Sequence, residues 1–188
     1  MNKLEDYIKI YSSWIAPKLC NEIRFEIESA KWEQHSFYSP IDGSYNNRSG
    51  DRELDVSWDN IKNRDVLTQR VWEAVSQYIL TDFKSESFSS WSGFTRIRFN
   101  RYTENKLMAK HVDHIHSMFD GNIKGIPVLS IVGLLNDDYE GGEFVMFDDR
   151  IIKLKQGDIL MFPSVFLYPH EVKPVTKGVR DSFVSWVW

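Results

Sequence analysis

The sequence predicts an α+β protein that is mainly β, with helices in its first half and a sandwich or barrel of strands in its second half. Two observations carry this prediction. Apolar residues recur with the period of a helix before residue 84, whereas short segments after residue 90 alternate or run apolar between turn residues. The chain has 188 residues and is 14% aromatic. That length suits one domain, with helices over about 1–83 and a β core over about 90–188.

Two helices are expected in the first half, over residues 17–31 and 63–83. Pro17 suits the first position of a helix, and Asn63 is a plausible N-cap. The polar segment 36–57 between them is rich in Ser, Asn, Gly and Asp, so we expect a long exposed loop that serves as a substrate lid. Both helices carry an apolar stripe at intervals of four residues: Leu19, Ile23 and Ile27 in the first, and Leu67, Val71, Val75 and Ile79 in the second.

The strands of the second half are marked by alternation, by apolar runs and by turns. In the segment TRIRFNRY, Ile97 and Phe99 alternate with arginines, and we expect Arg96 and Arg98 to lie on a solvated face. Turns at Gly-Gly and Gly-Asp separate later strands. The expected strands cover 95–102, 127–136, 140–147, two strands within 151–164, and a terminal hairpin over 170–188.

The net charge and the cysteine content indicate which partners and which cellular compartment the sequence favours. The formal net charge is −4 without a block of Lys or Arg, which disfavours a nucleic-acid partner. Cys20 is the only cysteine, so an intrachain disulfide is excluded and a reducing compartment is favoured. No apolar run approaches the roughly 20 residues that span a bilayer, and the first residues do not resemble a signal peptide. These features predict a soluble cytoplasmic protein.

The segment HVDHIHSMFDG, residues 111–121, holds three histidines and an aspartate within six residues. It is either a metal site or a polar loop with an accidental run of imidazoles. On an extended segment, residues two apart point to the same face, so His111 and Asp113 can converge on one point. His114 and His116 form a second pair with this spacing, so the cluster offers more than one way to hold a metal.

A third ligand must come from elsewhere, and the only histidine far downstream is His170. Two histidines and one carboxylate on one face of an ion give the facial triad of non-haem Fe(II) oxygenases. A terminal hairpin centred near Val175 would place Arg180 opposite His170, with Ser182 on the same face. An arginine buried there needs a carboxylate, which a ligand can supply in bidentate form. The alternative is a solvated charge at a sheet edge.

Taken together, these residues resemble the 2-oxoglutarate- and Fe(II)-dependent dioxygenases, and most closely their prolyl-4-hydroxylase-like branch. The resemblance covers about residues 96–188 and includes the motifs EGGEF and KQGDILMFPS. It implies a double-stranded β-helix (jelly roll) with the N-terminal helices packed on one sheet. It also implies Fe(II) held by His111, Asp113 and His170, with neither His114 nor His116 as a ligand.

The resemblance further implies that 2-oxoglutarate chelates the iron and that Arg180 takes its far carboxylate, with Ser182 as a second donor. Tyr102 either bonds this co-substrate or is a half-buried aromatic residue of its strand. The implied activity uses O₂ to hydroxylate a C–H bond, with release of succinate and CO₂. A peptidyl residue, proline first, is the expected substrate. A free amino acid, another small molecule or a nucleobase, and a non-catalytic jelly-roll binding module, are the alternatives.

Overall fold

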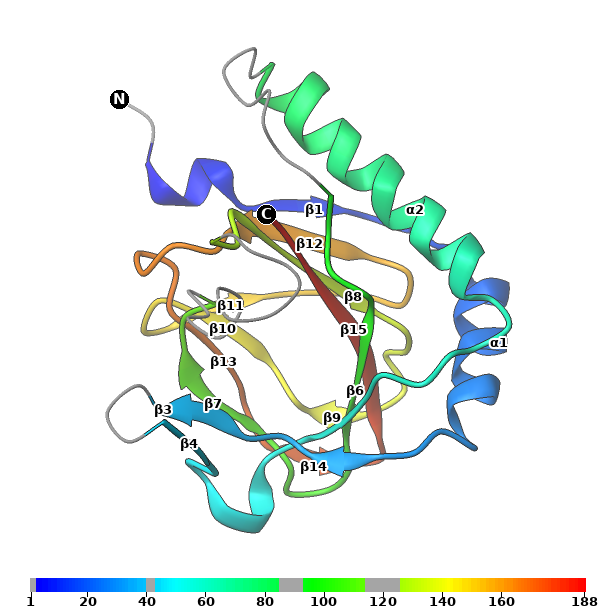
Figure 1. Ribbon diagram of the computed structural model, residues 1–188, viewed down its shortest axis with the longest axis vertical. Helices are drawn as coiled ribbons and strands as arrows, with labels where there is room; N and C mark the ends of the chain where they lie inside the picture. Colours follow the sequence, from blue (N-terminus) through cyan, green and yellow to red (C-terminus); the bar gives the residue numbers. More distant parts are fainter. Residues whose placement is uncertain (1–2, 40–42, 85–92, 114–125) are drawn as a thin grey trace.

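The computed structural model describes residues 3–39, 43–84, 93–113 and 126–188, and it has two facing antiparallel β-sheets with two helices outside the larger one (Figure 1). The predicted mainly β class is therefore confirmed. The larger sheet has seven strands in the order β1 (Lys9–Tyr11), β12 (Ile159–Pro163), β8 (Leu129–Leu134), β15 (Arg180–Val187), β6 (Arg98–Tyr102), β5 (Asp55–Ser57) and β2 (Glu33–Gln34).

The smaller sheet has four strands and lies across the inner face of the larger one (Figure 1). Two further pairs of strands complete the β structure: β14 (Val175–Lys177) with β9 (Glu140–Gly141), and β3 (Phe37–Ser39) with β4 (Ser44–Asn46). The order of the smaller sheet is β11 (Arg150–Ile152), β10 (Phe144–Met146), β13 (His170–Val172) and β7 (Met108–His111).

Alternation along the central strands divides the apolar residues into two cores. On β15, Phe183 and Val187 pack with the helices, whereas Val184 and Trp186 pack between the sheets. Successive side chains of a strand point to opposite faces, so one strand can serve both cores. Gly133 of β8 pairs with Phe183, and a Cβ at this position would lie 2.0 Å from the Phe183 ring.

The helices cover the outer face of the larger sheet (Figure 1). Helix α1 (Pro17–Ile27) begins at the expected proline and buries Ile23 and Ile27, but it ends four residues before the predicted boundary. Helix α2 (Arg64–Ser76) buries the predicted Leu67, Val71 and Val75, and it continues as a π-helical segment, Gln77–Asp82. Two short 3₁₀ turns, Leu4–Tyr7 and Gly50–Arg52, complete the helical structure. Within the described residues, no helix combines the length and apolarity that a membrane span requires.

Two expectations about connections are wrong. The expected loop over 36–57 contains, in its described part, the β3–β4 hairpin, a 3₁₀ turn and β5, which joins the larger sheet. The expected terminal hairpin is instead three strands in three different sheets. The chain leaves β13 at Pro174, whose carbonyl accepts a hydrogen bond of 3.0 Å from the Gly142 amide, so β14 pairs with β9 and not with its own neighbours.

Candidate functional site

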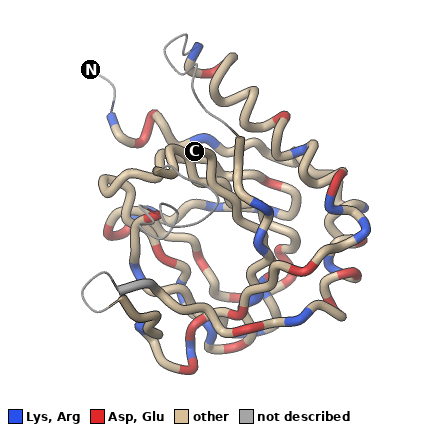
Figure 2. The backbone as a smooth tube through the Cα atoms, in the orientation of Figure 1, with Lys and Arg blue, Asp and Glu red and all other residues tan. Residues whose placement is uncertain are grey.

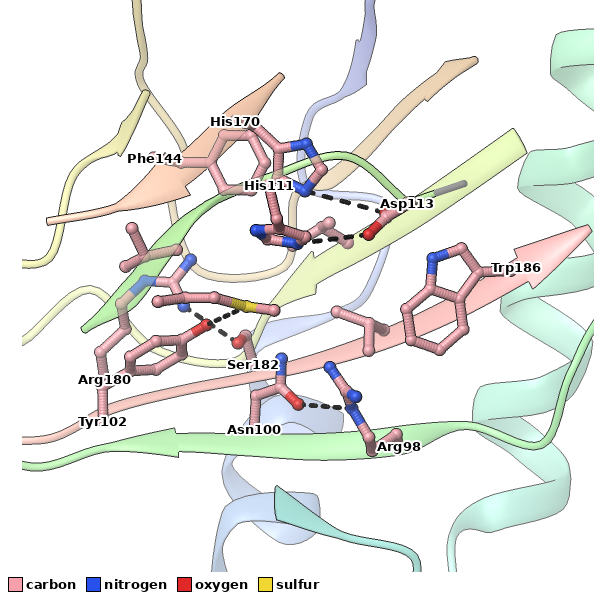
Figure 3. Close-up of a pocket in the computed structure, with 14 residues that line it drawn as sticks. Arg98, Asn100, Tyr102, His111, Asp113, Phe144, His170, Arg180, Ser182 and Trp186 are labelled. Atoms are coloured by element: carbon pink, nitrogen blue, oxygen red, sulfur yellow. Dashed lines mark hydrogen bonds and ion pairs between the residues drawn. The ribbon is translucent and has the colours of Figure 1, made fainter. Parts of the chain in front are cut away.

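A cavity lies between the two sheets and collects polar side chains from both (Figure 3). β6 and β15 supply side chains from positions of one parity, which share the inner face: Arg98, Asn100, Tyr102, Arg180, Ser182 and Trp186. The opposite wall includes His111, Asp113, Phe144 and His170.

Three potential metal ligands meet in this cavity. One ligand atom from each of His111, Asp113 and His170 lies within 4.8 Å of the others. The Nε2 atom of His111 is 3.3 Å from Asp113 Oδ1, and the Nε2 atom of His170 is 3.7 Å from Asp113 Oδ2. β7 and β13 are neighbours in the smaller sheet, with His170 directly paired to His111, and this pairing brings the two imidazoles together. The residues that the sequence singled out therefore converge.

The backbone orients both imidazoles toward the common centre. The Nδ1 atom of His111 is 2.8 Å from the carbonyl oxygen of Ala109, and the Nδ1 atom of His170 is 3.0 Å from that of Tyr168. A carbonyl only accepts, so each Nδ1 carries the proton and donates it. In the neutral ring Nε2 is then the nitrogen without a proton, which is the tautomer that a metal ligand needs, and both Nε2 atoms lie on the side of Asp113.

Asp113 is held as a carboxylate. Its side chain is buried, and its Oδ2 atom accepts a hydrogen bond of 2.7 Å from Ser130 Oγ. Burial alone raises the pKa of Asp113, but His170, His111 and the Ser130 hydroxyl together lower that pKa well below its usual range. Ser130 is in turn 2.7 Å from Ser164 Oγ. Asp113 therefore offers an anionic oxygen beside two imidazole nitrogens.

His170 is in its metal-binding charge state at neutral pH. Burial, and then the neighbouring His111, lower the pKa of His170 to about 4. Its ring is stacked on Phe144 with centroids 5.3 Å apart and meets Phe162 edge-on at 4.9 Å. These rings fix the imidazole in place and exclude water from one side of it.

Arg180 is a buried cation without a carboxylate in the described part of the chain. It is 1% exposed, its Nη1 atom donates to Ser182 Oγ at 3.0 Å, and its Nε atom has no partner. The guanidinium carbon lies 4.9 Å from the ring centre of Tyr102, its directly paired neighbour on β6. Because a buried charge is costly unless it is paired, this arrangement suits an acidic ligand.

Arg101, on the strand paired with that of Arg180, differs from Arg180 because it has carboxylate partners. Arg101 points to the opposite face of β6, where its Nε atom is 2.8 Å from Asp181 Oδ1 and an Nη2 atom is 2.9 Å from Glu28 Oε1. Arg24 of α1 also reaches Asp181, at 3.3 Å. The protein therefore provides carboxylates for arginines on the helix side of the sheet and leaves Arg180, on the cavity side, for a ligand.

Arg180, Ser182 and Tyr102 all line the cavity, and their role in binding the co-substrate stays a prediction. The expected hairpin pairing of Arg180 with His170 is wrong. His170 and Arg180 face each other from different sheets and are not cross-strand partners. Tyr102 is 2% exposed and is more deeply buried than the half-buried alternative assumed, with its hydroxyl 3.9 Å from Met108 Sδ.

Of the remaining expectations, the structure tests those for Arg96 and Arg98 but not those for His114 and His116. His114 and His116 lie outside the described residues, so their exclusion as ligands stays a prediction. Arg96 is exposed as expected, but Arg98 is only 8% exposed and lines the cavity, which corrects the expected solvated face. Ser130 was not anticipated, and nothing local in the apolar run around it marks it as a partner of Asp113.

Two imidazoles, one carboxylate and a nearby cation for an acidic ligand define the class of non-haem metal site with a 2-His-1-carboxylate triad. Residues 97–188 match the 2OG-Fe(II) oxygenase superfamily. A PKHD-type hydroxylase of Idiomarina loihiensis is 34% identical over 135 residues, which cover 68% of this chain and 60% of that relative. The chain belongs to the 2OG-Fe(II) oxygenase superfamily, whose name gives Fe(II) and 2-oxoglutarate as its cofactor and co-substrate.

Solved structures support the fold. A prolyl-4-hydroxylase of Pseudomonas putida matches 96% of this chain and 91% of its own with a TM-score of 0.67 and 20% identity. A prolyl hydroxylase of Trichoplax adhaerens, in complex with a hypoxia-inducible-factor peptide fragment, matches 97% and 84% with a TM-score of 0.70 and 15% identity. The predicted jelly roll with helices on one sheet is thereby confirmed.

Proposed function

We propose that this chain is an Fe(II)- and 2-oxoglutarate-dependent hydroxylase, and that His111, Asp113 and His170 hold the iron. The observation that carries the proposal is the convergence of these three side chains on a cavity that also contains an unpaired, buried arginine. Their donor set fits Fe(II) because it leaves the opposite side of the ion open to co-substrate and O₂. When bound, the iron supplies the oxidation in which O₂ hydroxylates a C–H bond while 2-oxoglutarate becomes succinate and CO₂.

The protein's own contribution is to bind and orient. Arg180 would hold the far carboxylate of 2-oxoglutarate with charge-assisted hydrogen bonds, and Ser182, which already accepts from Arg180, keeps the guanidinium in position. Tyr102 packs its ring against that guanidinium and closes the inner end of the cavity. Phe144 and Phe162 keep water from the His170 side.

A peptidyl residue, with proline first, is the proposed substrate. Support comes from the fold that this chain shares with prolyl hydroxylases and from its PKHD-type relative. A free amino acid or another small molecule would use the same chemistry and remains the second candidate, because the cavity also contains a charge suited to a small acid, described below.

The decisive experiment is an assay of succinate formation from 2-oxoglutarate with purified protein, with and without Fe(II), together with a mass-spectrometric search for a product 16 Da heavier than each candidate peptide. Succinate that depends on both Fe(II) and the protein is the expected result. A protein that retains no metal and forms no succinate would instead be a jelly-roll binding module.

A further inference from the structure

A second buried cation faces the cavity, at the end away from Arg180. Arg98 is the first residue of β6 and is 8% exposed. Figure 3 shows its side chain pointing into the cavity beside Trp186, whereas Arg180 lies at the other end beside Tyr102. The function proposed above gives Arg98 no role, although its burial is unusual for a charged residue.

The described residues leave Arg98 without an ion pair. Its Nε atom donates to Asn100 Oδ1 at 3.0 Å, and its guanidinium carbon lies 5.1 Å from the ring centre of Trp186 and 6.0 Å from that of Trp58. Asp113 is the nearby acid that acts on its charge, but the carboxylate of Asp113 is already engaged by the two imidazoles and Ser130. Burial lowers the pKa of Arg98 to about 10, so the guanidinium is charged at pH 7.

The two cavity arginines lie at different points along the sheet. Arg180 is paired with Tyr102, which lies four residues after Arg98 on β6, an offset of roughly 13 Å along the strand. Under the proposed function both carboxylates of 2-oxoglutarate are engaged, one by the metal and the other by Arg180. With that co-substrate between Arg180 and the metal ligands, Arg98 is left for a second molecule.

The surroundings of Arg98 have the composition of a binding site for an organic acid. Trp186 provides a flat apolar wall of the cavity, and Asn100 fixes the plane of the guanidinium through the Nε contact. The guanidinium can then present its two terminal nitrogens together, which is the geometry that a carboxylate accepts in bidentate form.

We propose that Arg98 binds a carboxylate of the substrate, so that the C–H bond to be oxidised lies near an acidic group. This proposal rests on the proposed function, because it assigns the substrate of that same site. The carboxylate has two possible sources, the terminal carboxylate of an amino acid or peptide, and an acidic side chain next to the hydroxylated residue.

Matched acid and amide substrates test the proposal and distinguish the two sources of the carboxylate. With Fe(II) and 2-oxoglutarate present, kcat/KM for N-acetyl-L-proline is compared with that for N-acetyl-L-prolinamide. In the same way, a capped Ala-Pro-Asp-Ala peptide is compared with its Ala-Pro-Asn-Ala counterpart. A charge-assisted contact predicts a kcat/KM roughly tenfold or more higher for the acid of one pair, and that pair identifies the source. In R98Q the ratio of kcat/KM for the acid to that for the amide should fall toward one, and R98K should retain part of the difference.

The matched control is R96Q, which alters an exposed arginine two residues away and should keep the wild-type ratio. A ratio near one in wild type, or an unchanged ratio in R98Q, would overturn the proposal.

A binding measurement keeps the assignment of Arg98 independent of catalysis. Acetate and acetamide are titrated by NMR into metal-free protein that carries R180Q, which removes the competing cation. Acetate should bind and acetamide should not, and binding should be lost when R98Q is added. Equal acetate binding with and without R98Q, in variants whose melting temperatures show that they are folded, would overturn the role of Arg98. Absence of Fe(II)-dependent succinate formation would overturn the proposed function alone.

Discussion

Ser130 of the larger sheet donates a hydrogen bond of 2.7 Å to Asp113, the acidic member of the candidate metal site. This contact crosses from β8 to the segment after β7 and joins the ligand to a rigid central strand. It also holds the orientation of the carboxylate, whose Oδ2 atom accepts from Ser130 and lies 3.7 Å from His170 Nε2, whereas Oδ1 is 3.3 Å from His111 Nε2.

Removal of that hydrogen bond should weaken metal binding. Partners of metal ligands typically contribute 10- to 100-fold in affinity, so S130A should raise the Kd for Fe(II) by about tenfold or more. Competition with a chelator under anaerobic conditions measures it. S185A is the matched control, because Ser185 is equally buried and bonds Thr95 away from the site. Equal metal affinity in S130A and wild type would show that Ser130 does not support the ligand.

Replacement of Asp113 should abolish iron-dependent turnover. Asp113 is the only anionic member of the candidate triad, and D113A leaves two neutral nitrogens that hold a divalent ion weakly. Succinate formation should fall to background, and chelator competition should show loss of the bound metal. D149A removes an exposed carboxylate of the β10–β11 turn and should behave as wild type. Activity in D113A within a few-fold of wild type would disprove the triad.

Loss of Arg180 should weaken the binding of 2-oxoglutarate. The lost charge-assisted contacts correspond to about 1.5–3 kcal/mol, so R180Q should raise the apparent KM for 2-oxoglutarate by about 10- to 150-fold. Without ligand, the variant should be at least as stable as wild type, because an unpaired buried charge is removed. Thermal denaturation with and without 2-oxoglutarate measures both effects. A ligand-induced rise in melting temperature that survives in R180Q would remove Arg180 from the site.

The strands of the second half and the candidate ligand pair His111 and Asp113 could be predicted because their signals are local. His111 and Asp113 are two residues apart on an extended segment, and the apolar run around Ile131 is a buried strand whatever its partners. The sheet that a strand joins is not determined by the local sequence. The segment after His170 has the composition of a hairpin, yet the backbone contact between Pro174 and Gly142 draws it to β9. This contact depends on a turn that is distant in the sequence, so the residues after His170 do not by themselves predict it.

The treatment of β6 shows a prediction that the sequence did allow. The alternation of the segment predicts a solvated face for Arg98, although residues 98, 100 and 102 have the same parity and therefore point to the same side of a strand as the candidate site residue Tyr102. The structure places all three in the cavity. Charged residues that alternate with apolar ones usually lie on a solvent-exposed face, which is why the pattern of this segment misplaces Arg98. Parity relative to a known site residue is the stronger criterion.

Cys20 should be unreactive until the protein unfolds. It is fully buried beneath α1, and burial raises the pKa of its thiol to about 11. At pH 8 only about one molecule in a thousand would carry a thiolate, which is the reactive form. Labelling with a thiol reagent should therefore be slow in buffer and fast in concentrated guanidinium chloride. Rapid labelling of the folded protein would show that α1 opens from the sheet.

Gly142 should be needed both for its backbone conformation and for the space that it leaves beside Arg180. Its φ is +64°, and a Cβ would lie 3.1 Å from Arg180 Cδ and 3.0 Å from Val175 Cγ2. Gly50 has a similar φ of +58° with no atom within 4 Å of such a Cβ. G50A therefore reports the backbone strain alone, about 1 kcal/mol of stability, and should leave the KM for 2-oxoglutarate unchanged.

G142A adds the steric contact to the same strain, so it should lose more stability than G50A and raise the KM for 2-oxoglutarate by displacing the Arg180 side chain. Urea denaturation gives the free energies of unfolding of both variants, and titration of 2-oxoglutarate in the succinate assay gives the KM. If the two glycine variants proved equal in stability and in KM, Arg180 would not depend on the Gly-Gly turn, and the pairing of β9 with β14 would be its only function.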